Sequence, residues 1–175
     1  MLLGIPSPDL SNLQAALRTR FPLIHRYGDA AECRRLGYLP LAISAFPRFL
    51  REDEELPRPL NFREIRTGAE EARYLAVEAA FWALHVRLAR RGFWRVRIGG
   101  DLVRMNGGSR RFADLWRASR REFRPRQRFI ELYYEEYDVR LVQNWDLTDW
   151  AFFRDAADRS SVERIVREVG LFVPE

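Results

Sequence analysis

Lysine is absent from this chain. All thirty basic side chains other than histidine, in 175 residues with a formal net charge of +5, are arginines. Arginine differs from lysine in presenting a planar guanidinium that binds phosphate or carboxylate through paired hydrogen bonds and stacks on aromatic rings. A GC-rich coding sequence would also replace lysine by arginine, and the presence of only four asparagines fits such a bias. Codon bias does not explain where the arginines lie.

Cysteine, histidine and long apolar runs are equally scarce. The single cysteine, Cys33, excludes an intramolecular disulfide and any cysteine-rich zinc motif, which is typical of a reducing compartment. The two histidines, His25 and His85, give little evidence for a functional site. No apolar run reaches 18 residues, and the N-terminus lacks the pattern of an export signal. We therefore expect a cytoplasmic protein without a membrane span.

What the chain does contain is sufficient for a folded core. Hydrophobic residues make up 47% of it and 23 residues are aromatic, which excludes a disordered or low-complexity protein. A chain of this length suits one domain. We expect a single domain over 1–175, with an irregular helical N-terminal part over 1–60 and an α+β core over 67–175.

The N-terminal third gives few firm predictions. Ser7-Pro8-Asp9 is a typical helix start, 23–27 has a strand pattern, and a short helix is expected from Asp29 to Arg35 with Gly37 at its end. Four prolines interrupt every pattern between residues 37 and 60.

The strongest single element is a long helix after Thr67. Thr67 and Glu70 form a capping-box pattern, and Gly92 follows the last basic turn as a helix stop. Its apolar residues fill two adjoining stripes, from Tyr74 to Leu88 and from Leu75 to Val86. The sequence therefore predicts a central helix over 67–91 that is covered on most sides.

Strands and shorter helices are predicted for the remainder. Two strands, 93–98 and 101–105, are joined by Gly99-Gly100 as a hairpin, and a helix follows over 109–123. Residues 128–142 have a strand pattern with a turn near 135–138. Two closing helices are expected, one from Asp146 or Thr148 and one from Ser160, where Ser160 and Glu163 resemble a capping box. This order predicts an α+β fold with an antiparallel sheet.

The arginines are concentrated in one segment. Residues 87–128 carry fourteen arginines and three acids, a local balance of +11, whereas 129–175 has a balance of −6. On the helix 109–123, Arg110, Arg117, Arg121 and Arg124 fall on one face, opposite an apolar face that contains Trp116. One face of this helix is expected to pack on the protein while the other presents guanidinium groups to solvent.

This pattern predicts a phosphate-binding surface. Gly107 and Gly108 before the helix would let backbone amides approach an anion at the positive end of the helix dipole. Strand residues would extend the surface, whereas Trp94 is expected in the core by side-chain alternation. The candidate nucleic-acid contacts are Arg95, Arg97, Arg104, Gly107, Gly108, Arg110, Arg111, Arg117, Arg121 and Arg124. We expect a non-catalytic protein that binds the phosphates of DNA or RNA.

Three alternatives remain at this point. The −6 segment 129–175 can neutralise the arginines internally. The basic patch can equally serve a protein-interaction module that meets an acidic partner surface or a second copy of the chain, since arginine is enriched in protein interfaces. A metal-dependent nuclease could use Glu78, Asp101 and Glu131, although the lysine that such a core usually adds is missing.

Other ionisable residues suggest structural roles. His85 is expected to be a hydrogen-bonded, partly buried histidine, because the glutamates on its stripe are too distant to share a metal ion. The aspartates at 146, 149, 155 and 158 are expected to be helix caps or to lie in exposed turns rather than to be cation ligands. Cys33 has arginines beside it but no signature of a thiol nucleophile. We expect no catalytic residue, resident metal or cofactor.

Overall fold

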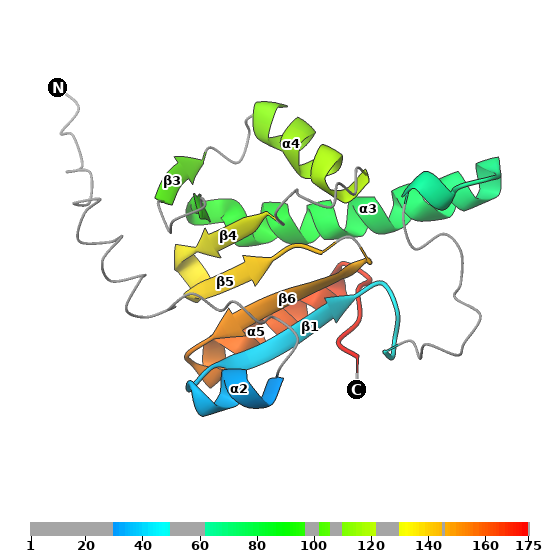
Figure 1. Ribbon diagram of the computed structural model, residues 1–175. Coiled ribbons are helices and arrows are strands. Elements are labelled where there is room, and N and C mark those ends of the chain that lie inside the picture. The colour runs from blue at the N-terminus through cyan, green and yellow to red at the C-terminus, as the bar shows by residue number, and fades with distance from the viewer. Residues whose placement is uncertain are drawn as a thin grey trace, which may run out of the picture.

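The computed structural model describes residues 30–49, 62–96, 102–105, 110–121, 130–144 and 146–174. These residues form a six-stranded antiparallel sheet with helices packed on it (Figure 1), which confirms the predicted α+β class. The strands are β1 (Leu39–Ser44), β2 (Phe93–Val96), β3 (Leu102–Met105), β4 (Glu131–Tyr134), β5 (Val139–Val142) and β6 (Thr148–Phe153). The helices are α2 (Ala30–Arg35), α3 (Gly68–Leu88), α4 (Arg110–Arg121) and α5 (Ala156–Glu168), with short 3-10 turns at Phe62–Glu64, Ala89–Arg91 and Glu135–Tyr137.

The strand order is β1-β6-β5-β4-β2-β3, so that β1 and β3 lie at the two edges. Strand β1 was not predicted, because Pro40 lies inside it. Proline lacks the N–H that a central strand needs, but an edge strand has a free side, and Pro40 is opposite Phe152 of the single neighbour β6. The edge position of β1 therefore explains how the strand accommodates a proline.

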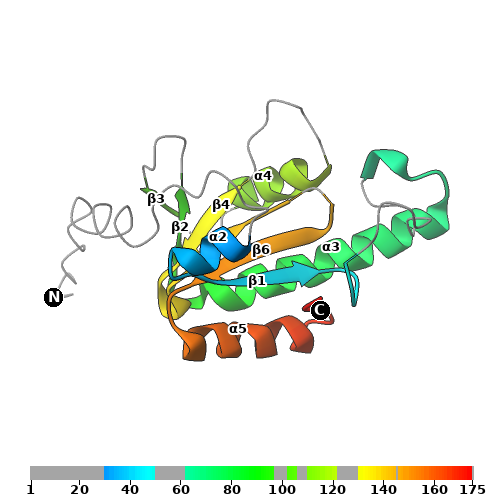
Figure 2. The same ribbon diagram turned by 60° about the horizontal axis from the view of Figure 1, so that its bottom comes forward.

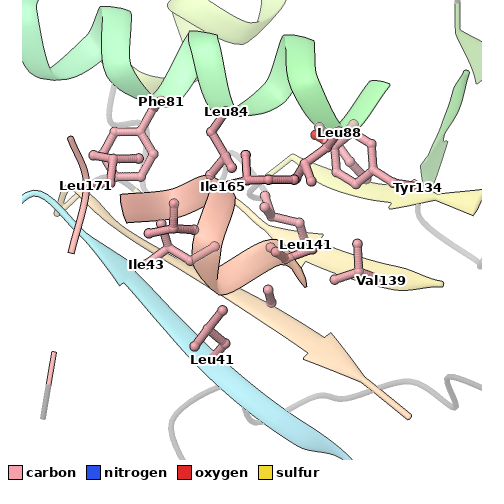
Figure 3. Close-up of a cluster of buried hydrophobic side chains, with 14 of the residues drawn as sticks. Leu41, Ile43, Phe81, Leu84, Leu88, Tyr134, Val139, Leu141, Ile165 and Leu171 are labelled. Atoms are coloured by element: carbon pink, nitrogen blue, oxygen red, sulfur yellow. The ribbon is translucent and has the colours of Figure 1, made fainter. Parts of the chain in front are cut away.

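The main core lies between the sheet and the helices α3 and α5 (Figures 2 and 3). Helix α3 contributes Phe81, Leu84 and Leu88 to this core, and α5 contributes Ile165. They meet the residues of the sheet that point to this side, which include Leu41, Ile43, Tyr134, Val139 and Leu141. Full burial of such side chains stabilises the fold by roughly 1.5–3 kcal/mol each.

A second, smaller core lies on the opposite face of the sheet. It contains Cys33 of α2 and Tyr38, together with Trp94, Tyr133 and Phe152 from three strands. Trp94 is 1% exposed, which confirms that it is a core residue. The Arg154 guanidinium lies 4.0 Å from the centre of the Tyr38 ring and donates to the Leu36 carbonyl, and so ties the end of α2 to β6.

Helix α3 begins at the predicted cap, but its α-helical part ends at Leu88, where the 3-10 turn Ala89–Arg91 leads to Gly92, and it is covered differently from the prediction. The Thr67 hydroxyl accepts from the Glu70 amide and the Glu70 carboxylate accepts from the Thr67 amide, while Gly92 has φ of +100°. The buried residues of α3, however, lie on one side only, and Leu75 and Val86 are 38% and 49% exposed. The prediction that α3 is covered on most sides was wrong, because the sheet covers only one of its two apolar stripes.

The central part of the chain follows the prediction closely. Strands β2 and β3 pair antiparallel as a hairpin, although its turn lies outside the described residues. Strands β4 and β5 also pair antiparallel, and Asp138 takes the left-handed conformation with φ of +40° in the turn before β5. The turn predicted near 135–138 is therefore confirmed.

The end of the chain corrects two predictions. The segment from Thr148 is strand β6, not a helix: Ala151 and Phe153 point into the main core while Phe152 points into the second core. Helix α5 starts one turn before Ser160, because the Asp155 carboxylate accepts from the amides of Ala157 and Asp158. Ser160 lies inside the helix and donates to the Ala156 carbonyl instead of capping it.

Candidate nucleic-acid interface

Helix α4 has the two-sided character that the sequence predicted. Phe112 and Trp116 are 0% and 3% exposed, and the Phe112 ring lies 4.8 Å from that of Phe93 on β2. The Trp116 ring packs edge-on against Trp82 of α3 at 5.1 Å. These aromatic contacts fix α4 beside α3, so the opposite side of α4 must face solvent.

The solvent side of α4 carries Arg110, Asp114, Arg117 and Arg121, which we call the α4 arginine face. Arg110 and Arg117 are both exposed. Arg117 forms an ion pair with Asp114 at 3.7 Å, and both side chains are about half exposed or more. Exposed pairs of this kind contribute roughly 0–1 kcal/mol, so Arg117 can exchange this partner for a phosphate.

Arg121 is held more firmly than its neighbours on the face. Its Nε donates to Glu78 Oε2 at 2.7 Å, its Nη2 donates to the other Glu78 oxygen, and its guanidinium lies 4.9 Å from the Phe62 ring centre. Hydrogen bonding to Glu78 raises the pKa of Arg121 above its ordinary value. Because Glu78 is buried, its carboxylate requires the Arg121 guanidinium as a partner. We therefore assign Arg121 to anchoring α4 on α3.

The structure divides the two described arginines of the hairpin between opposite faces. Arg104 is paired with Trp94, and its guanidinium lies 5.8 Å from the Trp94 ring centre on the side of the second core. Arg95 alternates with Trp94 and points to the other side, together with Phe93, which contacts α4. Arg95 therefore points to the side of the sheet on which α4 packs, and Arg104 points to the other side.

Several predicted contacts fall outside what the structure describes. Arg97, Gly107, Gly108 and Arg124 are outside the described residues, and Arg111 lies within α4 without a described side chain. The proposed approach of an anion to the backbone of Gly107 and Gly108 therefore stays a prediction.

Internal neutralisation accounts for part of the arginine cluster. Arg87 Nη1 lies 2.5 Å from Glu168 Oε2 of α5, and Arg91 lies 3.7 Å from Glu136. Arg120 pairs with Asp149 in the interior. The acidic C-terminal segment thus serves as counter-charge for three arginines, but within the described residues it does not reach Arg110 or Arg117.

Arg120 was not among the predicted site residues. It is 2% exposed, bonded to the equally buried Asp149, and placed 4.0 Å and 4.8 Å from the ring centres of Phe81 and Trp116. The signal was available: at 100° per residue, Arg120 is only about 40° from Trp116, on the buried side of the helix. Arg120 is therefore a core residue that locks α4 to β6.

Around Arg120 the interior holds a group of polar side chains. Asp149 Oδ1 accepts from the Asn144 amide at 3.0 Å, and burial raises the pKa of Asp149 while the Arg120 charge opposes the rise. His85 Nδ1 and the Tyr134 hydroxyl form a 2.7 Å hydrogen bond. Burial lowers the pKa of His85 to about 4 and raises that of Tyr134 well above its usual range. These groups are enclosed, which indicates a structural role. His85 is hydrogen-bonded as predicted, and at 3% exposed it is more completely buried than the sequence suggested.

The prediction of helix caps and exposed turns is confirmed for Asp155, which caps α5, but two other aspartates depart from it. Asp149 is 2% exposed and lies within β6. Asp146 is partly buried, and its Oδ1 accepts from the Thr148 amide at 3.0 Å. Burial, supported by the nearby Asp149 charge, raises the pKa of Asp146 from 3.8 to about 6.

Substituting Asp146→Asn should stabilise the protein in a pH-dependent manner. The pKa of Asp146 is about 6 in the folded protein, against 3.8 for an unperturbed aspartate. Between these pH values the folded state binds a proton that the unfolded state does not. Wild-type stability therefore falls as the pH rises through this window. Asparagine keeps the acceptor for Thr148 and does not titrate. We expect the unfolding free energy of D146N to exceed that of the wild type by about 1–3 kcal/mol above pH 6 and to converge with it near pH 4. Urea unfolding at pH 4.5, 5.5 and 7 checks this; an equal difference at all three would contradict it.

The described residues give no support to a metal or thiol site. Glu78 pairs with Arg121 on the side of the main core, whereas Glu131 pairs with Arg140 on the opposite face of the sheet, and Asp101 lies outside the described residues. No group of three or more His, Cys, Asp or Glu side chains that could hold a metal ion occurs within the part of the chain that the structure describes. Cys33 is 2% exposed.

Comparison with known proteins returns no relative: no protein-family model, curated protein or solved structure matches this chain. Over the described ranges, none of the helices combines the length and the apolar character that crossing a bilayer would require. The α4 arginine face is thus interpreted from its own chemistry.

Proposed function

We propose that the protein binds nucleic acid without catalysing a reaction, through phosphate contacts made by the α4 arginine face. The observation that carries this proposal is the exposure of Arg110 and Arg117 on a helix whose other side is fixed by buried Phe112 and Trp116. A cation on a rigid, packed helix loses less freedom when it meets a phosphate than one on a loose segment. Arg95, on the side of the sheet on which α4 packs, would extend the contact.

The spacing along α4 suits a chain of phosphates. Arg110 and Arg117 are seven residues apart, or about 10 Å along the helix axis. Phosphates of one DNA strand follow one another at about 3.4 Å of duplex axis, so the two guanidinium groups span roughly three nucleotides. Contacts of this kind position the ligand and carry no direct sequence readout.

The character of the face favours nucleic acid over an acidic protein partner. Protein interfaces depend on a central apolar anchor, and charged residues are depleted at their centre. Within the described residues, the exposed large hydrophobic side chains are Leu36, Phe49, Leu75, Val86 and Phe172, none of which lies on α4. A face of charges without an apolar anchor matches phosphate binding better.

The experiment is oligonucleotide binding by Arg110→Ala/Arg117→Ala, measured by fluorescence anisotropy with single strands and duplexes between about 50 and 300 mM salt. Arg121 is left intact, because its removal would leave the buried carboxylate of Glu78 without its hydrogen-bond donor. We expect weaker binding, with the slope of log affinity against log salt reduced by about 2 on duplex DNA, since each lost contact accounts for about 0.9.

The matched control is Arg164→Ala/Arg167→Ala on α5, which removes the same charge from a helix away from α4 (Figure 1). It should bind with nearly wild-type affinity and slope. No binding at 50 mM salt, or equal losses in both double variants, would overturn the proposal. If the wild type does not bind, the alternative, an acidic protein partner for the basic patch, would be the better account.

A further inference from the structure

The α4 arginine face contains one acidic residue among its arginines. Asp114 lies four residues after Arg110 and three before Arg117, on the same side of the helix at 100° per residue. Its side chain is 64% exposed, and its Oδ1 lies 3.7 Å from Arg117 Nη1. A carboxylate has about four positions at which it can accept a hydrogen bond, so this ion pair leaves room for a further donor.

The stability of the fold depends little on the acid at this position. The residues that hold α4 in place are on its other side, where Phe112, Trp116 and Arg120 are buried. Exposed pairs such as that of Asp114 with Arg117 contribute little to stability. On a surface that binds phosphates, moreover, a carboxylate repels the ligand. Asp114 therefore weakens the proposed interaction unless the ligand offers it a hydrogen-bond donor.

Duplex DNA presents hydrogen-bond donors, the amino groups of its bases, where a helix can reach them. The major groove of B-DNA is about 12 Å wide and admits an α-helix, whereas the minor groove is about 6 Å wide. In duplex RNA the major groove is too deep and narrow for side chains to read. Single strands are typically bound by stacking on aromatic rings, and both aromatic residues of α4, Phe112 and Trp116, are buried. The face therefore favours the major groove of DNA.

The chemistry of a carboxylate selects one base in that groove. An ionised carboxylate accepts hydrogen bonds and donates none. Guanine and thymine present acceptors there, and adenine presents its N6 amino group beside the acceptor N7, whereas cytosine presents its N4 amino group alone. Cytosine is therefore the base that best matches a carboxylate.

We propose that Asp114 accepts a hydrogen bond from the N4 amino group of a cytosine in the major groove of duplex DNA, while Arg110 and Arg117 hold the phosphates at its edges. This role rests on the proposed function, because it needs DNA bound at the α4 arginine face. Ala113 and Ala118 border the face on its two sides, and their methyl groups let a duplex approach the short carboxylate. Asp114 thus adds to the phosphate contacts the sequence readout that they lack.

The test compares two duplexes of about 20 base pairs, one of alternating C·G pairs and one of alternating A·T pairs, by fluorescence anisotropy at about 100 mM salt. Wild type should bind the C·G duplex about tenfold more tightly, as expected for one base contact. Asp114→Ala should show no preference between the duplexes. It should bind the A·T duplex more tightly than wild type does, because the carboxylate no longer repels it.

Asparagine at this position is the most specific replacement. Its amide both donates and accepts, and it therefore pairs with N6 and N7 of adenine. Asp114→Asn should reverse the preference and bind the A·T duplex more tightly than the C·G duplex. Because Asp114 is exposed, circular dichroism should show the wild-type fold for both variants.

The matched control is Glu71→Gln. Glu71 is exposed in the first turn of α3, and its charge, after that of Glu78, contributes to the raised pKa of Arg121 on the α4 arginine face. This variant should bind both duplexes more tightly by the same factor and keep the preference for C·G. If both Asp114 variants behave in the same way as Glu71→Gln, Asp114 makes no base contact.

The outcomes separate this role from the proposed function. Equal binding of both duplexes by the wild type, or tighter binding of a duplex RNA or a single strand of matching sequence, would overturn the cytosine contact and leave phosphate binding standing. A wild type that binds none of these probes would overturn nucleic-acid binding itself, and the role of Asp114 with it.

Discussion

The variant Asp149→Ala should lose about 3–5 kcal/mol of unfolding free energy, because it removes the carboxylate that forms an ion pair with the buried guanidinium of Arg120. The Arg120 and Asp149 side chains are 1% and 3% exposed, so water cannot replace the lost partner. Asp149 also accepts from the Asn144 amide, which would lose its acceptor. Urea unfolding at pH 7, followed by circular dichroism, measures the loss.

The matched variant replaces both members of the pair. Arg120→Met/Asp149→Leu puts apolar side chains of similar volume where the ions were, and buried ion pairs exchanged in this way are often neutral in stability. Methionine also preserves favourable contacts with the rings of Phe81 and Trp116. We expect the double variant to recover most of the loss. A single variant that costs less than about 1 kcal/mol would show that the pair does not hold α4 to β6.

The second large effect is expected for Phe112→Ala. Phe112 is 0% exposed and its ring lies within 4.9 Å of the ring centres of His85 and Phe93, so truncation opens a cavity at the joint between α4, α3 and β2. Core Phe→Ala substitutions cost about 3–5 kcal/mol. Because this joint fixes α4, oligonucleotide binding should weaken as well, although no arginine has been removed.

Phe172→Ala is the control for that experiment, since Phe172 is 43% exposed and its contacts with Ser44 are made by the backbone. It should cost about 1 kcal/mol or less and leave binding unchanged. Thermal unfolding and anisotropy under conditions where Phe112→Ala is still folded separate the two effects. Unchanged binding in a destabilised Phe112→Ala would show that the position of α4 is not what creates the binding surface.

The parts of the fold that follow from local pattern were predictable. The capping box at Thr67, the stop at Gly92 and the two-sided helix α4 each depend on residues within one or two turns of each other. The pairing of β2 with β3 likewise followed from two strand patterns separated in the sequence by two glycines. Local chemistry decides such elements, and the sequence displays it.

Features decided by distant partners were not predictable. Pro40 is tolerated in β1 because the fold places that strand at an edge, and β6 is a strand because both of its faces are buried. The pairing of Arg120 with Asp149 joins positions 29 apart, and that of Arg121 with Glu78 joins positions 43 apart. Charge counting alone cannot divide a cluster of arginines into those that serve the core and those that face solvent.

The candidate interface shows the same division. The sequence placed Arg110, Arg117 and Arg121 on one face, and the helix confirms their alignment. Arg121 is nevertheless committed to Glu78, and Arg104 lies on the far side of the hairpin from α4. Fewer arginines of α4 are therefore available to a phosphate ligand than the sequence pattern suggested. Among the described residues, these are Arg110 and Arg117.

The most direct test of the nucleic-acid interface is to map the amide resonances of the ¹⁵N-labelled protein that shift when an oligonucleotide is added at low salt. Our account predicts that the largest shifts fall on α4 around Arg110 and Arg117, with smaller ones at Arg95, and that they vanish in Arg110→Ala/Arg117→Ala. Shifts confined to α5, or an unchanged spectrum at saturating oligonucleotide, would contradict it.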